Sequence, residues 1–185
     1  AAMGLQRGDR VAIFMPNSPQ FVIAFYGILK AGGVAVATNP LYTPRELEHQ
    51  MKDSGAELIL VMSNFYRTIK QVQPNTSLKK VIVCRIKDYF PPVVRTVFTL
   101  FMEKKMGHRV ELEAGDEWFQ EVLARHSPEQ RPQLALGPDD VALLQYTGGT
   151  TGLSKGAVGT HRNLVANTIQ CRVWQPQIRE GEEVT

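Results

Sequence analysis

The stretch VAIFMPNSPQFVIAFYGILKAGGVAVAT, residues 11–38, decides the fold class. It begins with VAIFM and ends with VAVAT, two short runs without the polar alternation of a half-exposed strand, so each predicts a strand covered on both faces. Between them Ser18 can cap a helix, Pro19 suits its first position and Gly32 can end it. A strand, a helix and a strand at this spacing predict a right-handed crossover in a parallel sheet.

The same alternation continues along the chain. Thr43 and Glu46 have the spacing of a capping box, Pro44 lies between them, and Gly55 can end the helix that they begin. Further strands are predicted at the apolar runs 58–62, 81–86 and 141–146. Further helices are predicted at 66–72 and 161–174. We therefore expect an α/β fold with a mostly parallel sheet flanked by helices.

The segment 87–137 interrupts this alternation and predicts a less regular helical insertion. Pro91 and Pro92 introduce one helix, predicted over 93–106. Asp116 is placed to cap a second helix in DEWFQEVLARH.

The predicted helix 93–106 is also the candidate for membrane contact. At about 1.5 Å per residue it is about 21 Å long, which is too short to span a bilayer. It is apolar nearly all round, with Arg95, Lys104 and Lys105 among its residues. Such a pattern favours burial or a partner surface, and peripheral contact with the inner face of the cell membrane is the alternative.

The overall composition is that of an ordinary globular protein. Of 185 residues, 43% are hydrophobic and 21% are charged, which excludes a disordered chain, a collagen and a disulfide scaffold. The net charge of +3 is too small to indicate nucleic-acid binding. Cys84 and Cys171 lie far apart and are expected to be buried free thiols in a reducing compartment. AAMGLQRGDR does not look like a signal peptide and no apolar run approaches the ~20 residues of a membrane span, so we expect a cytoplasmic protein.

One glycine- and threonine-rich segment carries the chemistry, QYTGGTTGLSKGA at 145–157, between a predicted strand and a predicted helix. Its glycines let the backbone approach a ligand, and successive free N–H groups form an anion-binding concavity. Hydroxyl groups and the Lys155 ammonium add donors that suit a polyphosphate. Ser154 before Lys155 excludes a Walker loop, and the adjacent Gly148 and Gly149 exclude the dinucleotide fingerprint. A flexible surface loop is the alternative for such a composition.

The string YTGGTTGLSKGA resembles the phosphate loop of the adenylate-forming superfamily, which comprises acyl-CoA synthetases, aryl-CoA ligases, luciferases and peptide-synthetase adenylation domains. NPLYTPREL at 39–47 and THRNLVAN at 160–167 are similar to the same superfamily, the former to its fatty-acyl branch. The similarity covers the chain and is weakest at 87–137. Gly148 stands where the general loop has Ser, which resembles bacterial long-chain fatty-acid–CoA ligases, and Ser154 stands where it has Pro.

This resemblance implies a piece of an ATP-dependent, AMP-forming long-chain fatty-acid–CoA ligase. Such an enzyme joins a fatty acid to ATP as an acyl-adenylate, releases pyrophosphate and transfers the acyl group to coenzyme A. The implied cofactors and substrates are ATP, Mg²⁺, coenzyme A and a fatty acid. The residues implied to hold the ATP phosphates are Tyr146, Thr147, Gly148, Gly149, Thr150, Thr151, Gly152, Leu153, Ser154, Lys155 and Gly156. Among them Thr150, Thr151 and Lys155 are expected to contact phosphate through their side chains, and Thr147 is expected to meet Mg²⁺.

The resemblance places no catalytic acid, base or nucleophile within 1–185. The superfamily's acyl-pocket motif, glutamate motif, ribose-binding aspartate, hinge and C-terminal lysine are not in the sequence. We therefore expect part of a large N-terminal AMP-binding domain, inactive alone and self-associating through exposed apolar surface. Two alternatives stay open: a piece of an aryl- or medium-chain acyl-CoA ligase, and a non-catalytic nucleotide-binding module.

The remaining polar candidates have simpler explanations. The histidines show no metal-ligand spacing and are interpreted as structural or surface groups: His49, His108, His126 and His161. Tyr42 and Arg45 are interpreted as parts of a turn and of the helix start that follows it.

Overall fold

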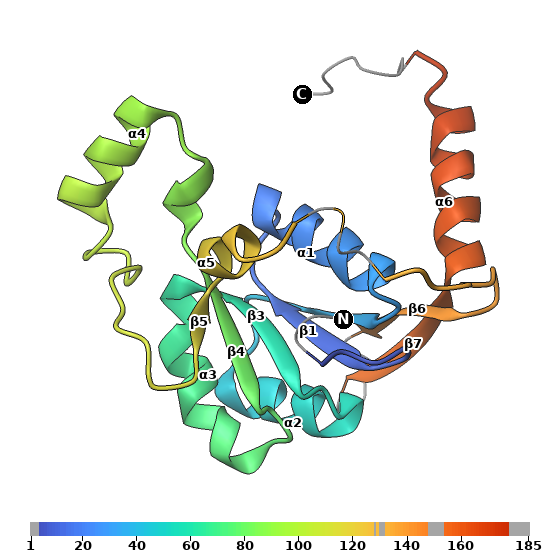
Figure 1. The fold of residues 1–185 in the computed structure, drawn as a ribbon, viewed down its shortest axis with the longest axis horizontal. Coiled ribbons are helices and arrows are strands. Elements are labelled where there is room, and N and C mark those ends of the chain that lie inside the picture. Colours follow the sequence, from blue (N-terminus) through green and yellow to red (C-terminus); the bar gives the residue numbers. More distant parts are fainter. Residues whose placement is uncertain (1–3, 128, 130–131, 148–153, 178–185) are drawn as a thin grey trace.

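The computed structural model describes residues 4–127, 129, 132–147 and 154–177. Within them the strands form one sheet, in the order β5-β4-β3-β1-β2-β6-β7 (Figure 1). The strands are β1 Arg10–Phe14, β2 Val34–Thr38, β3 Leu58–Met62, β4 Lys80–Cys84, β5 Glu117–Trp118, β6 Val141–Thr147 and β7 Lys155–Thr160. Paired neighbours run parallel except β6 and β7, which are antiparallel. The expected mostly parallel α/β sheet is confirmed.

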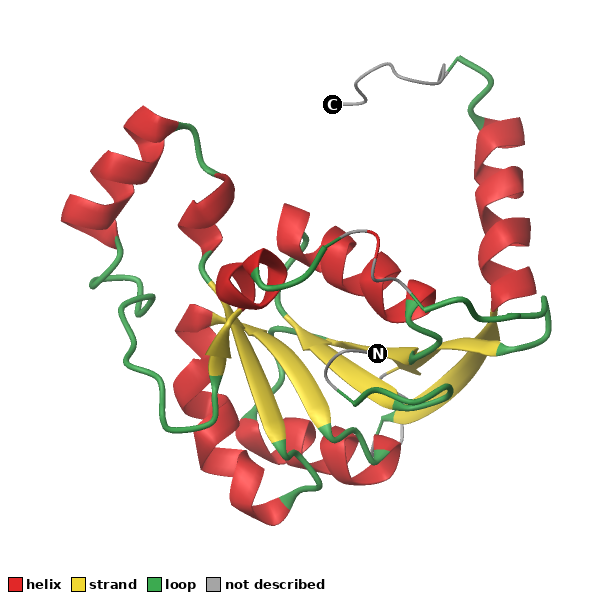
Figure 2. Cartoon of the chain, viewed as in Figure 1, coloured by secondary structure: helices red, strands yellow, loops and turns green. Residues whose placement is uncertain are grey.

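The helices cover both faces of the sheet (Figure 2). They are α1 Pro19–Lys30, α2 Pro44–Ser54, α3 Tyr66–Val72, α4 Pro92–Val97, α5 Phe119–Ala124 and α6 His161–Trp174. Shorter turns are η1 Ser63–Phe65, η2 Gln73–Asn75, η3 Ile86–Tyr89 and the π-helical η4 Phe98–Met102. No helix in the described ranges is both long and apolar enough to cross a membrane.

The place of β1 at the centre of the sheet explains why the run VAIFM, residues 11–15, is wholly apolar. Ala12 and Phe14 belong to the core cluster shared with α2 and α3. Val11 and Ile13 belong to the cluster on the other face, shared with α1 and α5. Successive side chains of a strand point to opposite faces, so a strand with helices on both sides needs an apolar residue at every position.

The helix boundaries follow the predicted caps. The Ser18 hydroxyl accepts a hydrogen bond from the Phe21 N–H, and α1 begins at Pro19. Thr43 and Glu46 form the full capping box at the start of α2. Gly55 ends α2 in the left-handed conformation at φ 61°, where a residue with a Cβ is strained.

Three predicted boundaries are wrong. Strand β4 ends at Cys84 rather than 86, because Arg85 leaves the sheet and its guanidinium lies 3.7 Å above the Trp118 ring. The helix predicted over 93–106 begins at Pro92, passes into wider turns at Phe98 and ends with η4. Helix α5 begins at Phe119 and not directly after Asp116, because residues 117–118 form β5 and pair with β4.

Asp116 therefore does not cap α5. Its carboxylate accepts a 2.6 Å hydrogen bond from the Tyr66 phenol and lies 3.1 Å from the Lys70 ammonium. Burial and the Asp116 hydrogen bond raise the pKa of Tyr66 to about 12. These contacts tie the middle of the 87–137 segment to α3.

The last strand was not predicted at all. Residues 155–160 were expected to continue the loop, but they form β7 against β6.

The expectation that both cysteines are buried is wrong for Cys171. Cys84 is buried, whereas Cys171 is exposed on α6.

Candidate phosphate-binding site

The glycine-rich segment leaves the sheet at the carboxyl end of β6, which pairs in parallel with β2. Ligands of open α/β sheets bind outside the carboxyl ends of the strands. The incoming arm of the segment ends with Tyr146 and Thr147, and the outgoing arm begins with Ser154, Lys155 and Gly156. The predicted residues Gly148, Gly149, Thr150, Thr151, Gly152 and Leu153 lie outside the described residues.

The register of β6 and β7 brings the two arms together. Tyr146 is opposite Gly156 and Thr147 is opposite Lys155. A Cβ on Gly156 would lie 3.1 Å from two ring carbons of Tyr146, so glycine leaves the space that the ring occupies.

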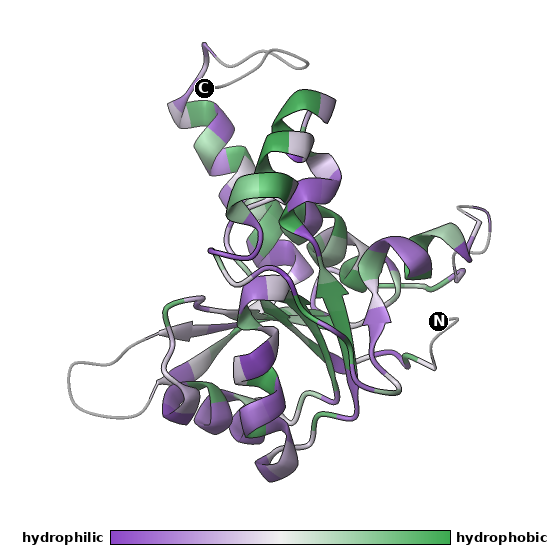
Figure 3. Ribbon diagram, turned by 90° about the vertical axis from the view of Figure 1, so that its left-hand side faces the viewer, coloured by the Kyte–Doolittle hydropathy of each residue, from purple (hydrophilic) through white to green (hydrophobic). Residues whose placement is uncertain are grey.

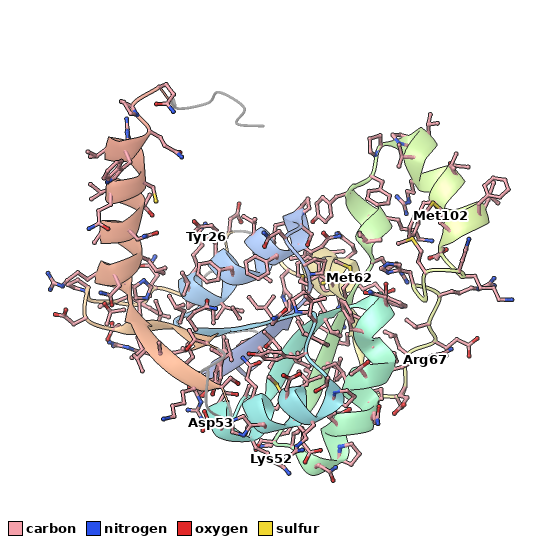
Figure 4. The ribbon with its side chains drawn as sticks, turned by 180° about the vertical axis from the view of Figure 1, so that it is seen from behind. Tyr26, Lys52, Asp53, Met62, Arg67 and Met102 are labelled. Carbon is pink, nitrogen blue, oxygen red and sulfur yellow. The ribbon has the colours of Figure 1, made fainter. Side chains whose placement is uncertain are left out.

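Helix α2 holds the incoming arm through Tyr146. This side chain is 7% exposed, and its phenol donates a 2.6 Å hydrogen bond to Asp53 Oδ2. Burial and the Asp53 carboxylate raise the pKa of the phenol well above its ordinary value, so it remains a neutral donor. In Figure 4, Asp53 lies on α2 near the beginning of β7.

The same helix holds the outgoing arm through His49. Its Nε2 lies 3.1 Å from the carbonyl oxygen of Ser154. A carbonyl only accepts, so Nε2 carries the proton and donates. His49 and Asp53 are four residues apart on α2, which places them one turn apart on the same side of the helix. One helix face therefore fixes both arms of the segment, and we refer to His49, Asp53, Tyr146 and Ser154 as the loop clamp.

Lys155 is the cation of the site. Lys155 is exposed at the first position of β7. Its ammonium makes no hydrogen bond or ion pair with any residue that the structure describes. Thr147, opposite it at the last position of β6, is also exposed. A free ammonium and a hydroxyl at the base of a loop with many backbone N–H groups suit an anionic ligand.

The other predicted candidates have structural roles. The buried His108 ring lies 2.8 Å through Nδ1 from the Ser63 hydroxyl, and burial lowers its pKa. The backbone N–H of His161 donates to the carbonyl of Asp140 at the start of α6. Asn39 forms the turn before α2, as expected for the segment with Tyr42. In the described part of the chain, no three His, Cys, Asp or Glu residues gather as a metal site.

Sequence reasoning missed the loop clamp. His49 and Asp53 were separated from the loop by about a hundred residues of sequence, and a helical i, i+4 pair of polar residues is ordinary on a solvated face. The parallel pairing of β2 with β6, which the sequence does not display, brings α2 beside the two arms of the segment.

The fold and the site define an α/β protein that presents a glycine-rich segment and an exposed lysine at the carboxyl edge of its sheet. The chain belongs to the AMP-binding enzyme family, whose model matches residues 1–184.

Individual relatives refine this assignment. The chain is 42% identical over 185 residues to a long-chain-fatty-acid–CoA ligase of Escherichia coli, covering 98% of this chain and 33% of the relative. It is 32% identical over 168 residues to 4-coumarate–CoA ligase 2 of rice, covering 91% of this chain and 27% of that relative. The crystal structure of a long-chain-fatty-acid–CoA ligase from Archaeoglobus fulgidus superimposes with a TM-score of 0.71 at 32% identity, covering 93% and 29%. The chain thus spans about a third of the length of these relatives.

Proposed function

We propose that this chain is part of an ATP-dependent, AMP-forming long-chain fatty-acid–CoA ligase and that it supplies the phosphate-binding loop. The observation that carries the proposal is a clamped glycine-rich loop with a free lysine, in a chain 42% identical to a ligase of that name. In the proposed reaction a fatty acid carboxylate attacks the α-phosphate of ATP, pyrophosphate leaves, and the thiol of coenzyme A then displaces AMP from the acyl-adenylate.

In this reaction the chain's own residues bind and orient. The Lys155 ammonium and the loop N–H groups neutralise phosphate charge and hold the α-phosphate for in-line attack. The loop clamp fixes the two ends of the loop, so less conformational freedom is lost when the nucleotide binds. None of these groups transfers a proton or forms a bond to the substrate. We propose that the groups that do so belong to the part of the relatives that this chain does not span.

Mg²⁺ fits the site as a partner of the nucleotide. It is usually held by one or two protein groups together with substrate phosphates, rather than by a cage of side chains. The exposed Thr147 hydroxyl at the loop base is the candidate protein ligand, and the phosphates of the nucleotide would supply further oxygen ligands. When bound, the ion would offset charge on the leaving pyrophosphate.

An aryl substrate is the second candidate, favoured by the 32% identity to the rice 4-coumarate ligase. The two are separated by assaying a protein of the relatives' full length that carries these residues. Pyrophosphate release is measured with ATP, Mg²⁺ and coenzyme A and with either palmitate or 4-coumarate. We expect turnover with palmitate; turnover with 4-coumarate alone would show an aryl ligase, and ATP binding without turnover on either acid would show a nucleotide-binding module.

We also propose that the 185-residue chain by itself associates with copies of itself. Helix α6 supports this, because it buries no residue and exposes Val165, Ile169, Val173 and Trp174, the last to 85%. An apolar face of this kind is covered by another surface in a stable protein.

A further inference from the structure

The segment 91–107 stands away from the sheet, on the side opposite α6 (Figure 1). Helix α4 passes directly into η4, and Gly107 ends the segment at φ 74°. Phe98 is the buried residue of α4 and η4, and it packs edge-on against Phe90 and His108. This aromatic cluster therefore helps to attach the protruding helix to the rest of the fold.

The rest of this segment exposes large apolar side chains. Val93 is 75% exposed, Leu100 70% and Phe101 73%. Four more are about half exposed, namely Val94, Val97, Met102 and Met106. Figure 3 shows the hydrophobic colour along this projection, and Figure 4 labels Met102 on it. Large apolar side chains that gather at high exposure on one projecting segment indicate an interaction site.

The charges of the segment are sorted by sign. Its acidic residue, Glu103, faces inward, 2.7 Å from the Lys87 ammonium, and both side chains are about 15% exposed. Its basic residues, Arg95, Lys104 and Lys105, are exposed beside the apolar side chains. The surface presented to the outside therefore combines apolar and cationic groups, while the anionic group is neutralised within the fold.

We propose that residues 91–107 dock this protein on the surface of an anionic lipid bilayer. The charge arrangement selects this occupant. Apolar side chains enter the boundary between headgroups and acyl chains, and basic residues beside them attract anionic headgroups. The segment is too short to span the hydrocarbon core, so it lies in the interface. The proposal does not depend on the ligase reaction, because docking requires neither ATP nor an acyl substrate.

The test measures co-sedimentation of a full-length protein carrying these residues with vesicles, without ATP. Vesicles of pure phosphatidylcholine are compared with vesicles containing phosphatidylglycerol, and we expect binding mainly to the latter. Lys104→Gln with Lys105→Gln should weaken that binding roughly 25-fold, about fivefold for each lysine. Leu100→Ser with Phe101→Ser should weaken it by at least about tenfold. The matched controls, Leu41→Ser at an 86% exposed leucine and Lys79→Gln at a 72% exposed lysine side chain, should bind like the wild type.

Three results would overturn the proposal. The first is equal binding by all variants, or none by the wild type. The second is a shift of Leu100→Ser/Phe101→Ser from dimer to monomer in sedimentation velocity, because the face would then join two copies of the chain. The third is a large fall in the thermal unfolding temperature of that variant, because the face would then be covered by the rest of the full-length protein. A Phe101→Trp variant gives an independent readout, since brominated anionic lipid should quench the added fluorescence.

Discussion

The phenol of Tyr146 donates a 2.6 Å hydrogen bond to the carboxylate of Asp53, across 93 residues of sequence. This bond joins the strand that leads into the loop to the helix that follows β2. His49, one turn earlier on that helix, makes the matching contact to Ser154 on the other arm. The position of the loop is therefore set by α2 as much as by the strands beside it.

Removing the hydrogen bond alone should loosen the incoming arm. Tyr146→Phe keeps the ring against Gly156 and deletes the donor, so we expect a loss of about 1 kcal/mol in unfolding free energy. Asp53 is exposed, so its carboxylate can be hydrated in the variant and no charge is left buried without a partner. Urea denaturation measures the change. Asp53→Asn keeps an acceptor for the phenol and should lose less; an equal or larger loss would contradict the role given to the bond.

Adding one methyl group at Gly156 should be costly. The new Cβ of Gly156→Ala would lie 3.1 Å from the Tyr146 ring, and we expect a destabilisation of about 1–3 kcal/mol. Gly137→Ala is the control, because its Cβ would meet only the Asp140 carboxylate, at 3.9 Å. Thermal unfolding of both variants compares them directly. Similar unfolding temperatures would show that the ring moves aside without cost.

Removing the loop cation should reduce activity without affecting the fold. In a full-length ligase carrying these residues, Lys155→Ala should lower kcat/KM for ATP about 30- to 150-fold, the equivalent of ~2–3 kcal/mol. Its unfolding temperature should stay unchanged, because the side chain has no partner among the described residues. Lys79→Ala, at another exposed lysine, should leave the kinetics unaltered. Wild-type kinetics of Lys155→Ala at subsaturating ATP would exclude a phosphate contact.

The buried histidine should make stability sensitive to mild acid. Burial lowers the pKa of His108 below its ordinary 6.5, so the folded state binds fewer protons than the unfolded state. Stability should therefore fall as the pH drops below about 6.5 and through the lower folded pKa. Urea midpoints measured from pH 7.5 to 5 should show this slope, and His108→Gln, which does not titrate, should show a smaller one. Identical slopes for the wild type and His108→Gln would show that His108 does not cause the pH dependence of stability.

The 185-residue chain alone should release no pyrophosphate. It carries the proposed phosphate-binding segment but spans about a third of its relatives' length, and holding the phosphates alone does not position both reactants. The chain is incubated with ATP, Mg²⁺, palmitate and coenzyme A, beside a full-length ligase. Release at a comparable rate would falsify the assignment of the catalytic groups to the rest of the relatives' length.

The 185-residue chain alone should also self-associate, which light scattering over a concentration series measures. A monomer at every concentration would exclude this association.

Local signals in the sequence predicted most of the fold. The cap at Ser18 and the box of Thr43 with Glu46 acted through neighbours three residues away, which a sequence displays directly. Strand β7 was missed because two glycines and an alanine interrupt the apolar pattern of KGAVGT, and the strand forms through its pairing with β6.

Long-range polar contacts account for the other errors. Asp116 has the local features of a cap, but its partners Tyr66 and Lys70 lie 50 and 46 residues away. The glycine-rich segment was singled out by its glycines and Lys155, and its phosphate-binding role stays a prediction. The clamp that positions it could not be predicted, since no local pattern distinguishes His49 from another polar residue on a helix.

The strand order also determines how the sheet is assembled during synthesis. Among the strands that the structure describes, the central strand β1 is translated before the others, and β2 and β3 follow soon after on its two sides. The outer edge of β2 receives its partner only when Val141 and the rest of β6 have been translated. Until then the outer edge of Val34–Thr38 leaves its backbone groups unpaired and is a template for other chains. Chaperone dependence of the nascent chain should thus concentrate in the interval between these two strands.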